Sequence, residues 1–156
     1  MTVHNTSWIT TATGTTPAEQ YTRATVNDNM NDVRVNYYVD NTCAWQDLPL
    51  SLSGWHAADG SGNGNRRTIA IECIMSSAYN SVDKKSEDNC ARLAAALLKK
   101  YNLDISHLFT HTHWLNVRMV KVVLWIISIQ QEMLTRCVLS TFCLTGQSSR
   151  KRYRCI

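Results

Sequence analysis

The chain has 156 residues, with 16 basic and 12 acidic side chains and a formal net charge of +4. A chain of this length corresponds to one domain and can bury roughly two-thirds of its unfolded surface, which is enough for a compact enzyme. Its longest apolar run, residues 122–127, is far shorter than the ~20 residues that a membrane-spanning helix needs, so we expect no membrane span.

Cysteine spacing and charge both characterise the chain further. Six cysteines form no Cys-x-x-Cys pair and no N-terminal signal peptide precedes them, so we expect reduced thiols in a protein made in the cytoplasm. Residues 1–118 carry ten basic and eleven acidic side chains, whereas residues 119–156 carry six basic side chains and one acidic one. The second segment also has no proline and a single glycine. We therefore predict a folded body at 1–118 and a divergent tail at 119–156.

The first predicted elements are a strand and a helix. Residues 1–6 have the composition of a short strand. Thr16 is a good N-cap, Pro17 suits the first helical position, and Glu19 follows the cap by three residues, as in a capping box. We expect this helix to run to about Asn31.

A hairpin, a long loop and a buried strand are predicted next. Residues 33–40 and 43–48 are rich in Tyr, Val and Trp and predict two antiparallel strands. Residues 53–67 are rich in Gly, Ser and Asn and predict a loop. Residues 68–74 form a short apolar run that contains Glu72. Because a buried carboxylate is costly without partners, Glu72 is a candidate site residue.

The last element of the body is an amphipathic helix that we expect to begin after Ser86 as its cap. Its apolar residues recur at helical spacing, at Cys90, Leu93, Ala94, Leu97, Leu98 and Tyr101. Residues 107–110 then lead into a second histidine segment at 111–114. Together the elements predict an α/β fold with a mixed sheet flanked by helices.

Two distant histidine segments and one acidic residue suggest a metal site. His4 belongs to the first predicted strand, His111 follows a later one, and Glu72 lies between them in sequence. Two imidazoles and a nearby carboxylate are parts of a catalytic zinc site with an open water position. The pattern does not supply a third protein ligand.

Six short motifs occur in an order that resembles a known family. They are Val-His-Asn-Thr at 3–6, Tyr-Tyr-Val-Asp at 37–40, Leu-Pro-Leu at 48–50, Trp-His-Ala-Ala-Asp-Gly at 55–60, Ile-Ala-Ile-Glu at 69–72 and His-Thr-His-Trp at 111–114. Residues 1–118 thereby resemble the catalytic domain of zinc-dependent N-acetylmuramoyl-L-alanine amidases of phage endolysins and prophages. That family shares its fold with peptidoglycan recognition proteins.

The resemblance implies zinc as cofactor and roles for several residues. His4 and His111 match zinc-binding histidines, and Glu72 matches the carboxylate beside the metal that carries the proton. Trp55 and His56 match the loop that lines the substrate groove. We expect His113 to pack near the ligands rather than to bind the metal, because neighbouring histidines on the same face of a strand need not both be ligands.

The implied reaction is hydrolysis of the amide that joins N-acetylmuramic acid to L-alanine. Zinc would polarise the carbonyl and activate water. The substrate would be peptidoglycan, met after release of the protein from the cytoplasm, and we expect a monomer that does not bind nucleic acid.

The chain departs from the family at three places. Asn36 stands where many relatives have a histidine, and the segment that usually precedes the first strand is absent. No Cys-Pro dipeptide, the source of the family's third zinc ligand, follows His113. The tail resembles the family nowhere.

A shifted reading frame accounts for the tail. If one nucleotide is restored after the Arg118 codon, codons permitted by the sequence allow Asp-Gly-Lys-Ser-Gly-Thr and later Tyr-Lys-Met-Cys-Pro-Leu-Tyr. The second run contains the missing Cys-Pro, and its cysteine would overlap the codons of Cys137 and Val138. This reading favours a frameshifted endolysin gene, leaves Cys137 as the in-frame candidate for the third ligand, and predicts a weak or inactive amidase.

Simpler interpretations remain open. A single histidine such as His4 is more often a core or surface residue, Glu72 can be an ion-pair partner, and Cys137 can be a buried thiol. One alternative function is a peptidoglycan-binding pseudoenzyme with an incomplete metal site. Another is a nucleic-acid-binding protein that acts through the basic run at 149–154, whose affinity would fall steeply with salt.

Overall fold

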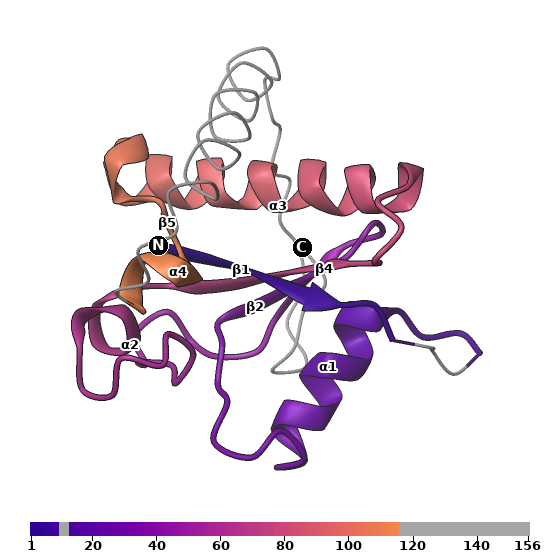
Figure 1. Ribbon diagram of the computed structural model, residues 1–156, viewed down its shortest axis with the longest axis horizontal. Helices are drawn as coiled ribbons and strands as arrows, with labels where there is room; N and C mark the ends of the chain where they lie inside the picture. The colour runs from indigo at the N-terminus through magenta and orange to yellow at the C-terminus, as the bar shows by residue number, and fades with distance from the viewer. Residues whose placement is uncertain (10–12, 116–156) are drawn as a thin grey trace, which may run out of the picture.

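A five-stranded mixed sheet forms the centre of the computed structural model, which describes residues 1–9 and 13–115 (Figure 1). The strand order is β3-β2-β4-β1-β5; β2 and β3 are antiparallel and the other neighbours are parallel. The strands are β1 (Thr2–Ser7), β2 (Tyr37–Val39), β3 (Ala44–Gln46), β4 (Ala70–Met75) and β5 (Phe109–Thr110). The helices are α1 (Pro17–Val26), α2 (Asn63–Arg67), α3 (Ser81–Lys100), the 3-10 turn η1 (Ile105–His107) and α4 (His111–Trp114).

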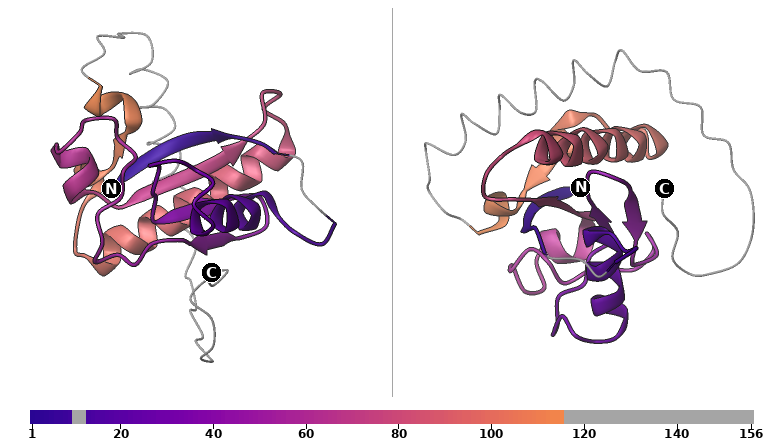
Figure 2. Two further views of the ribbon diagram at one scale, coloured as in Figure 1. Left: turned by 90° about the horizontal axis from the view of Figure 1, so that it is seen from below. Right: turned by 90° about the vertical axis from the view of Figure 1, so that its right-hand side faces the viewer.

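Helices cover both faces of this sheet. The long helix α3 lies on one face and α1 on the other, as two further views show (Figure 2). The larger core lies under α3, where Cys90, Ala94 and Leu97 pack against Ile71 and Cys73 of β4. A smaller core under α1 contains tyrosine, tryptophan and aliphatic side chains. The predicted mixed sheet flanked by helices is therefore confirmed.

The strand register places one row of side chains across the face that α1 partly covers. His4 of β1 is paired with Glu72 of β4, Glu72 with Tyr38 of β2, and Tyr38 with Trp45 of β3. Residues paired in register point to the same face of a sheet. The row therefore brings a histidine and a carboxylate together although they lie 68 positions apart in the sequence.

Helix α1 begins where predicted and ends earlier. The Thr16 hydroxyl accepts a hydrogen bond from the backbone N–H of Glu19, while the Glu19 carboxylate pairs with Arg23. The helix stops at Val26 instead of Asn31, because Asp28 adopts a left-handed backbone with φ of 61°. The prediction of the helix end was wrong.

Helix α3 begins at Ser81, six residues before the predicted start. Asn80 is the N-cap, and a capping box joins it to Asp83. The Asp83 carboxylate also accepts hydrogen bonds from the backbone and hydroxyl of Ser76. Ser86 is buried inside the helix and its hydroxyl donates to Val82 O, so the prediction that it caps the helix was wrong.

The predicted hairpin and loop differ in detail from the structure. The hairpin is confirmed as β2 and β3, but with three residues in each strand. Asp40 closes its turn by accepting from the backbone of Thr42 and Cys43. The predicted loop at 53–67 contains the short helix α2, whose first turn is held by the Asp59 carboxylate through the N–H groups of Gly64 and Asn65.

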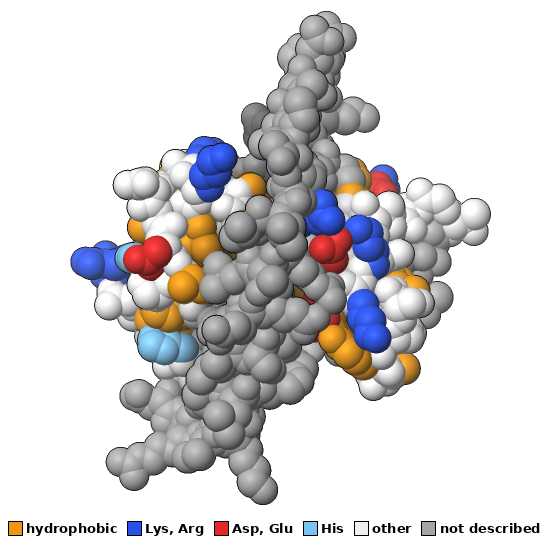
Figure 3. Space-filling model, turned by 90° about the horizontal axis from the view of Figure 1, so that it is seen from above, with side chains coloured by type: hydrophobic (Ala, Val, Ile, Leu, Met, Phe, Trp, Pro, Cys, Tyr) orange, Lys and Arg blue, Asp and Glu red, His pale blue; other side chains and the backbone are white. Residues whose placement is uncertain are grey.

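The tail predicted at 119–156, with Cys137, lies outside the described residues. Within the described part of the chain, no helix is long and apolar enough to cross a membrane. The space-filling view in Figure 3 shows mixed charge on the described surface, with lysine and arginine side chains distributed among acidic ones.

Candidate active site

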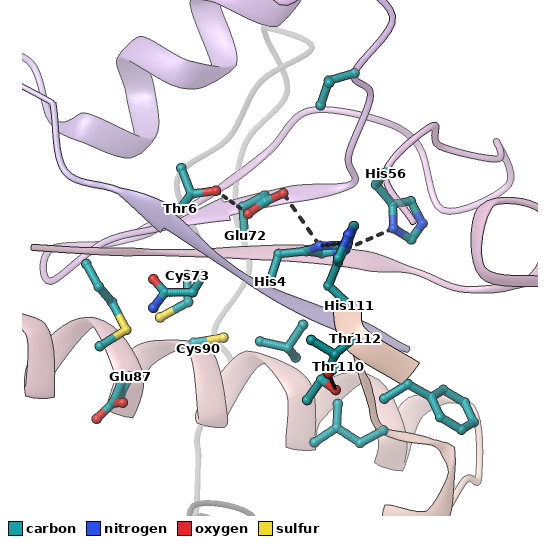
Figure 4. Close-up of a pocket in the computed structure, with 16 residues that line it drawn as sticks. His4, Thr6, His56, Glu72, Cys73, Glu87, Cys90, Thr110, His111 and Thr112 are labelled. Carbon is teal, nitrogen blue, oxygen red and sulfur yellow. Dashed lines mark hydrogen bonds and ion pairs between the residues drawn. The ribbon is translucent and has the colours of Figure 1, made fainter. Parts of the chain in front are cut away.

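His4 and His111 meet at one end of the sheet (Figure 4). His4 lies in β1 and is 7% exposed, and His111 is the first residue of α4, directly after β5. Their Nδ1 atoms are 3.0 Å apart. Burial, and then the nearby rings of His56 and His111, lower the pKa of His4 to about 3, so this imidazole is neutral at physiological pH.

Glu72 lies beside this pair. Its Oε1 is 4.0 Å from His4 Nδ1, and the Thr6 hydroxyl donates a hydrogen bond to Oε2. Burial raises the pKa of Glu72 to about 7, although the Thr6 hydrogen bond lowers it. Both protonation states of this carboxyl group are therefore populated near neutral pH, as an acid–base residue requires.

His56 contacts His4 from the other side. Its Nδ1 is 2.9 Å from His4 Nε2, and its Nε2 is 3.5 Å from the Thr68 hydroxyl. The Asn65 side chain fixes the local backbone by accepting from the N–H of His56 at 2.7 Å. Burial lowers the pKa of His56 to about 4, although the negative charge of Asp59 raises it.

His56 stays a predicted substrate-binding residue, and the structure adds a contact with His4. The ring is 8% exposed and protein atoms engage both of its nitrogens. The side chain is therefore placed to hold His4. Trp55, the adjacent residue, is 49% exposed, while its backbone pairs with that of Arg34.

His113 lies apart from the histidine pair. It is on the helical turn α4 rather than on a strand, and its ring packs against Phe109 and Trp114 at centroid distances of 4.7 Å each. The exposed His107 pairs with Asp104. His4, His56 and His111 thus form the cluster, and the other two histidines of the chain do not join it.

A cavity of about 550 Å³ opens beside these residues. One wall carries His4, His56, Glu72 and His111, and the opposite side reaches Glu87 on α3. The space is large enough for a drug-sized or short peptide ligand.

The donor set fits part of a zinc site. Two nitrogen ligands of a tetrahedral zinc ion lie roughly 3.4 Å apart, and the Nδ1 atoms of His4 and His111 are 3.0 Å apart. Neutral imidazole is the form that binds metal. Among residues 1–9 and 13–115, however, no group of three His, Cys, Asp or Glu side chains is spaced to hold a metal ion.

Several side chains that hold the cluster were not predicted. Thr6 follows His4 by two residues and therefore shares its face of β1, a signal that the strand period could have supplied. The Trp114 indole donates to the Thr2 hydroxyl at 2.9 Å, and Thr2 is 2.8 Å from the Thr68 hydroxyl. Sequence offers no signal for these contacts, because their partners come from three separate segments.

Comparisons with known proteins agree with this geometry. A sequence model of the family described as N-acetylmuramoyl-L-alanine amidase matches residues 1–121. The amidase CwlH of Bacillus subtilis is 34% identical over 115 residues, which are 73% of this chain and 44% of that protein. The amidase XlyA of the same organism is 37% identical over 79 residues, 51% of this chain and 26% of that protein.

Solved structures show the same fold. The catalytic domain of PlyG has a TM-score of 0.71 at 29% identity, and the match covers 92% of this chain and 85% of that domain. The chain spans less than half the length of the two curated relatives, so it corresponds to a part of each.

Proposed function

The chain belongs to the N-acetylmuramoyl-L-alanine amidase family, and from that premise we propose that it hydrolyses the amide between N-acetylmuramic acid and L-alanine in peptidoglycan. The observation that carries the proposal is the meeting of His4, His111 and Glu72 on one wall of an open cavity. The neutral imidazole of His4 and a carboxyl group with a pKa of about 7 suit metal-assisted amide hydrolysis.

His4 and His111 would hold the metal through their Nδ1 atoms, with Cys137 as third ligand. Bound zinc polarises an amide carbonyl and lowers the pKa of water towards ~7. The low pKa of His4 keeps its lone pair available over the physiological pH range, so a proton does not compete with the metal there.

Glu72 would move the proton. As a carboxylate it takes a proton from the attacking water, and as a carboxylic acid it gives that proton to the departing amine of L-alanine. The Thr6 hydroxyl holds Oε2, which leaves Oε1 directed to the side of His4. Trp55, which precedes His56 and has half of its surface exposed, would contact the glycan or the stem peptide.

The substitution Glu72→Gln tests the role of this carboxylate. We expect bound zinc and peptidoglycan binding to be retained while release of free L-alanine amino termini falls ~10²-fold or more. The matched control is Glu87→Gln, which changes a carboxylate of the same cavity that bonds the Tyr79 hydroxyl on the α3 side. Equal loss of zinc in Glu72→Gln would assign Glu72 a structural role.

A peptidoglycan-binding protein without turnover is the second candidate. The observation behind it is one of sequence, since no Cys-Pro dipeptide follows His113. The same assay separates the candidates. Binding to peptidoglycan without any release of amino termini, in the presence of zinc, would support the second.

A further inference from the structure

We propose that Thr68 and His56 are positioning residues that fix the tautomer of His4. In this tautomer Nδ1 is unprotonated and its lone pair faces His111. The inference rests on the proposed function in one respect, namely that this lone pair would serve to bind the metal. The assignment itself follows from hydrogen-bond partners that run from a backbone carbonyl to the His4 ring.

The hydroxyl groups of Thr2 and Thr68 each have a defined hydrogen-bond direction. The Trp114 indole N–H can only donate, so Thr2 accepts from it at 2.9 Å and keeps its own proton for another partner. The Thr68 hydroxyl donates to the Gly64 carbonyl oxygen at 2.7 Å, because a carbonyl can only accept. The Thr2 proton therefore points to Thr68 in the 2.8 Å contact between the two hydroxyls.

The direction of the Thr68 hydroxyl determines the tautomer of His56. Each hydroxyl has one proton, and that of Thr68 is used on Gly64. In the 3.5 Å contact with His56, the Thr68 oxygen can only accept, so His56 carries its proton on Nε2. A neutral imidazole has one N–H, and the Nδ1 of His56 is therefore an acceptor.

The tautomer of His56 determines that of His4. His56 Nδ1 and His4 Nε2 are 2.9 Å apart, and the bare nitrogen of His56 requires His4 to donate from Nε2. His4 Nδ1 is then unprotonated and faces His111 Nδ1 at 3.0 Å. In zinc sites the second nitrogen of a ligand histidine usually donates to a neighbouring acceptor, and a second histidine provides that acceptor here.

The two predicted ligands then differ in their response to metal. Without metal, His111 must donate its Nδ1 proton to the bare His4 Nδ1 in their 3.0 Å contact. Zinc held by His4 and His111 would take the place of that proton. We therefore expect His111 to carry its proton on Nε2 when zinc binds, while His4 keeps its proton on Nε2 throughout.

The contacts also tie the two ligand segments together. Trp114 lies in the same helical turn as His111, and its indole bonds Thr2, which is two residues before His4 on β1. The hydrogen bonds from Trp114 through Thr2, Thr68 and His56 to His4 thus close a ring at the 3.0 Å contact with His111. Loss of the Thr68 oxygen interrupts this ring without touching either ligand.

Two-bond ¹H–¹⁵N correlation spectra of the full chain, before and during zinc addition, test the assignment directly. Such spectra separate the protonated from the bare nitrogen of each ring. We expect Nε2–H in His4 and His56 in both states, and a change from Nδ1–H to Nε2–H in His111 alone. A metal-free His4 that carries its proton on Nδ1 would overturn the inference, even if the chain cleaves peptidoglycan.

Threonine variants add a second readout. Thr68→Val should weaken zinc binding about tenfold and give mixed tautomers of His56 and His4, while Thr68→Ser should restore both. The control Thr25→Val removes a buried hydroxyl that bonds Tyr38 and should leave the histidine signals unchanged. Unchanged tautomers in a folded Thr68→Val protein would count against the role of Thr68. Failure of the wild-type chain to bind zinc would instead reject the proposed function, and the metal-free spectrum would still decide the tautomer.

Discussion

Two opposing effects determine the pKa of the Glu72 carboxyl group. Burial in β4 raises its pKa to about 7, and the hydrogen bond from Thr6 lowers it. The same hydrogen bond fixes one carboxylate oxygen and leaves the other near His4. Thr6 is therefore a positioning residue for the proposed proton transfer.

The substitution Thr6→Val removes that hydroxyl at nearly constant volume. We expect kcat to fall about tenfold with KM unchanged, because the carboxylate is no longer held in place while the groove stays intact. Thr6→Ser keeps the hydroxyl and should restore kcat. Steady-state kinetics on purified peptidoglycan fragments measure both values, and an increase in KM without a fall in kcat would disprove the positioning role.

At the level of elements, helix α3 depends on one buried acidic residue near its start. Asp83 is fully buried and accepts hydrogen bonds from Ser76 and from the backbone of Asn80. Burial raises the pKa of Asp83, but these hydrogen bonds outweigh it, and the pKa lies below the ordinary value of 3.8. The charged form therefore stabilises the folded state.

The substitution Asp83→Asn should lower the free energy of unfolding by about 1 kcal/mol at pH 7. A carboxyl group whose pKa is lowered by folding stabilises the folded state at pH values above its unfolded-state pKa, and this stabilisation is lost as pH falls through its folded-state pKa. The difference in unfolding free energy between the wild-type protein and Asp83→Asn should therefore shrink below about pH 4. Urea unfolding at several pH values measures it. Asp88→Asn, which removes surface ion pairs of the same helix, serves as control and should cost less. A difference that stays constant down to pH 2 would refute the assignment to Asp83.

The boundaries of the helices show which features of the fold could be predicted from sequence patterns. Thr16 and Pro17 marked the start of α1 correctly, because an N-cap acts through its own local backbone. The end of α1 depends on the left-handed backbone of Asp28, and the start of α3 depends on the contact between Asp83 and Ser76. Neither feature follows from apolar periodicity, which describes the buried face of a helix and not its ends.

At the scale of the molecule, the parallel register of β1 and β4 assembles the candidate site. Ordered motifs predicted His4, His111 and Glu72, and the sheet brings these residues together. The contact between His56 and His4 could not be predicted, because a motif match does not show which way a ring faces. This contact joins residues 52 positions apart.

The tail leads to a prediction about bound zinc. Two imidazoles without a thiolate are fewer protein ligands than the three usual in catalytic zinc sites. We expect the chain as written to bind zinc weakly, Cys137→Ser to bind it more weakly, and a version with the restored reading frame to bind it tightly. Zinc content after dialysis gives the comparison. Full zinc occupancy that is unaffected by Cys137→Ser would exclude Cys137 as the third ligand.

The central claim is that this site cleaves the amide at L-alanine. The most direct measurement counts free L-alanine amino termini after the chain is incubated with purified peptidoglycan, then after zinc is removed by a chelator, and again after zinc is added back. We predict release that stops on chelation and returns with zinc, slow for the chain as written and faster for the version with the restored frame. Peptidoglycan that stays bound to both proteins without new amino termini, in the presence of zinc, would contradict the claim.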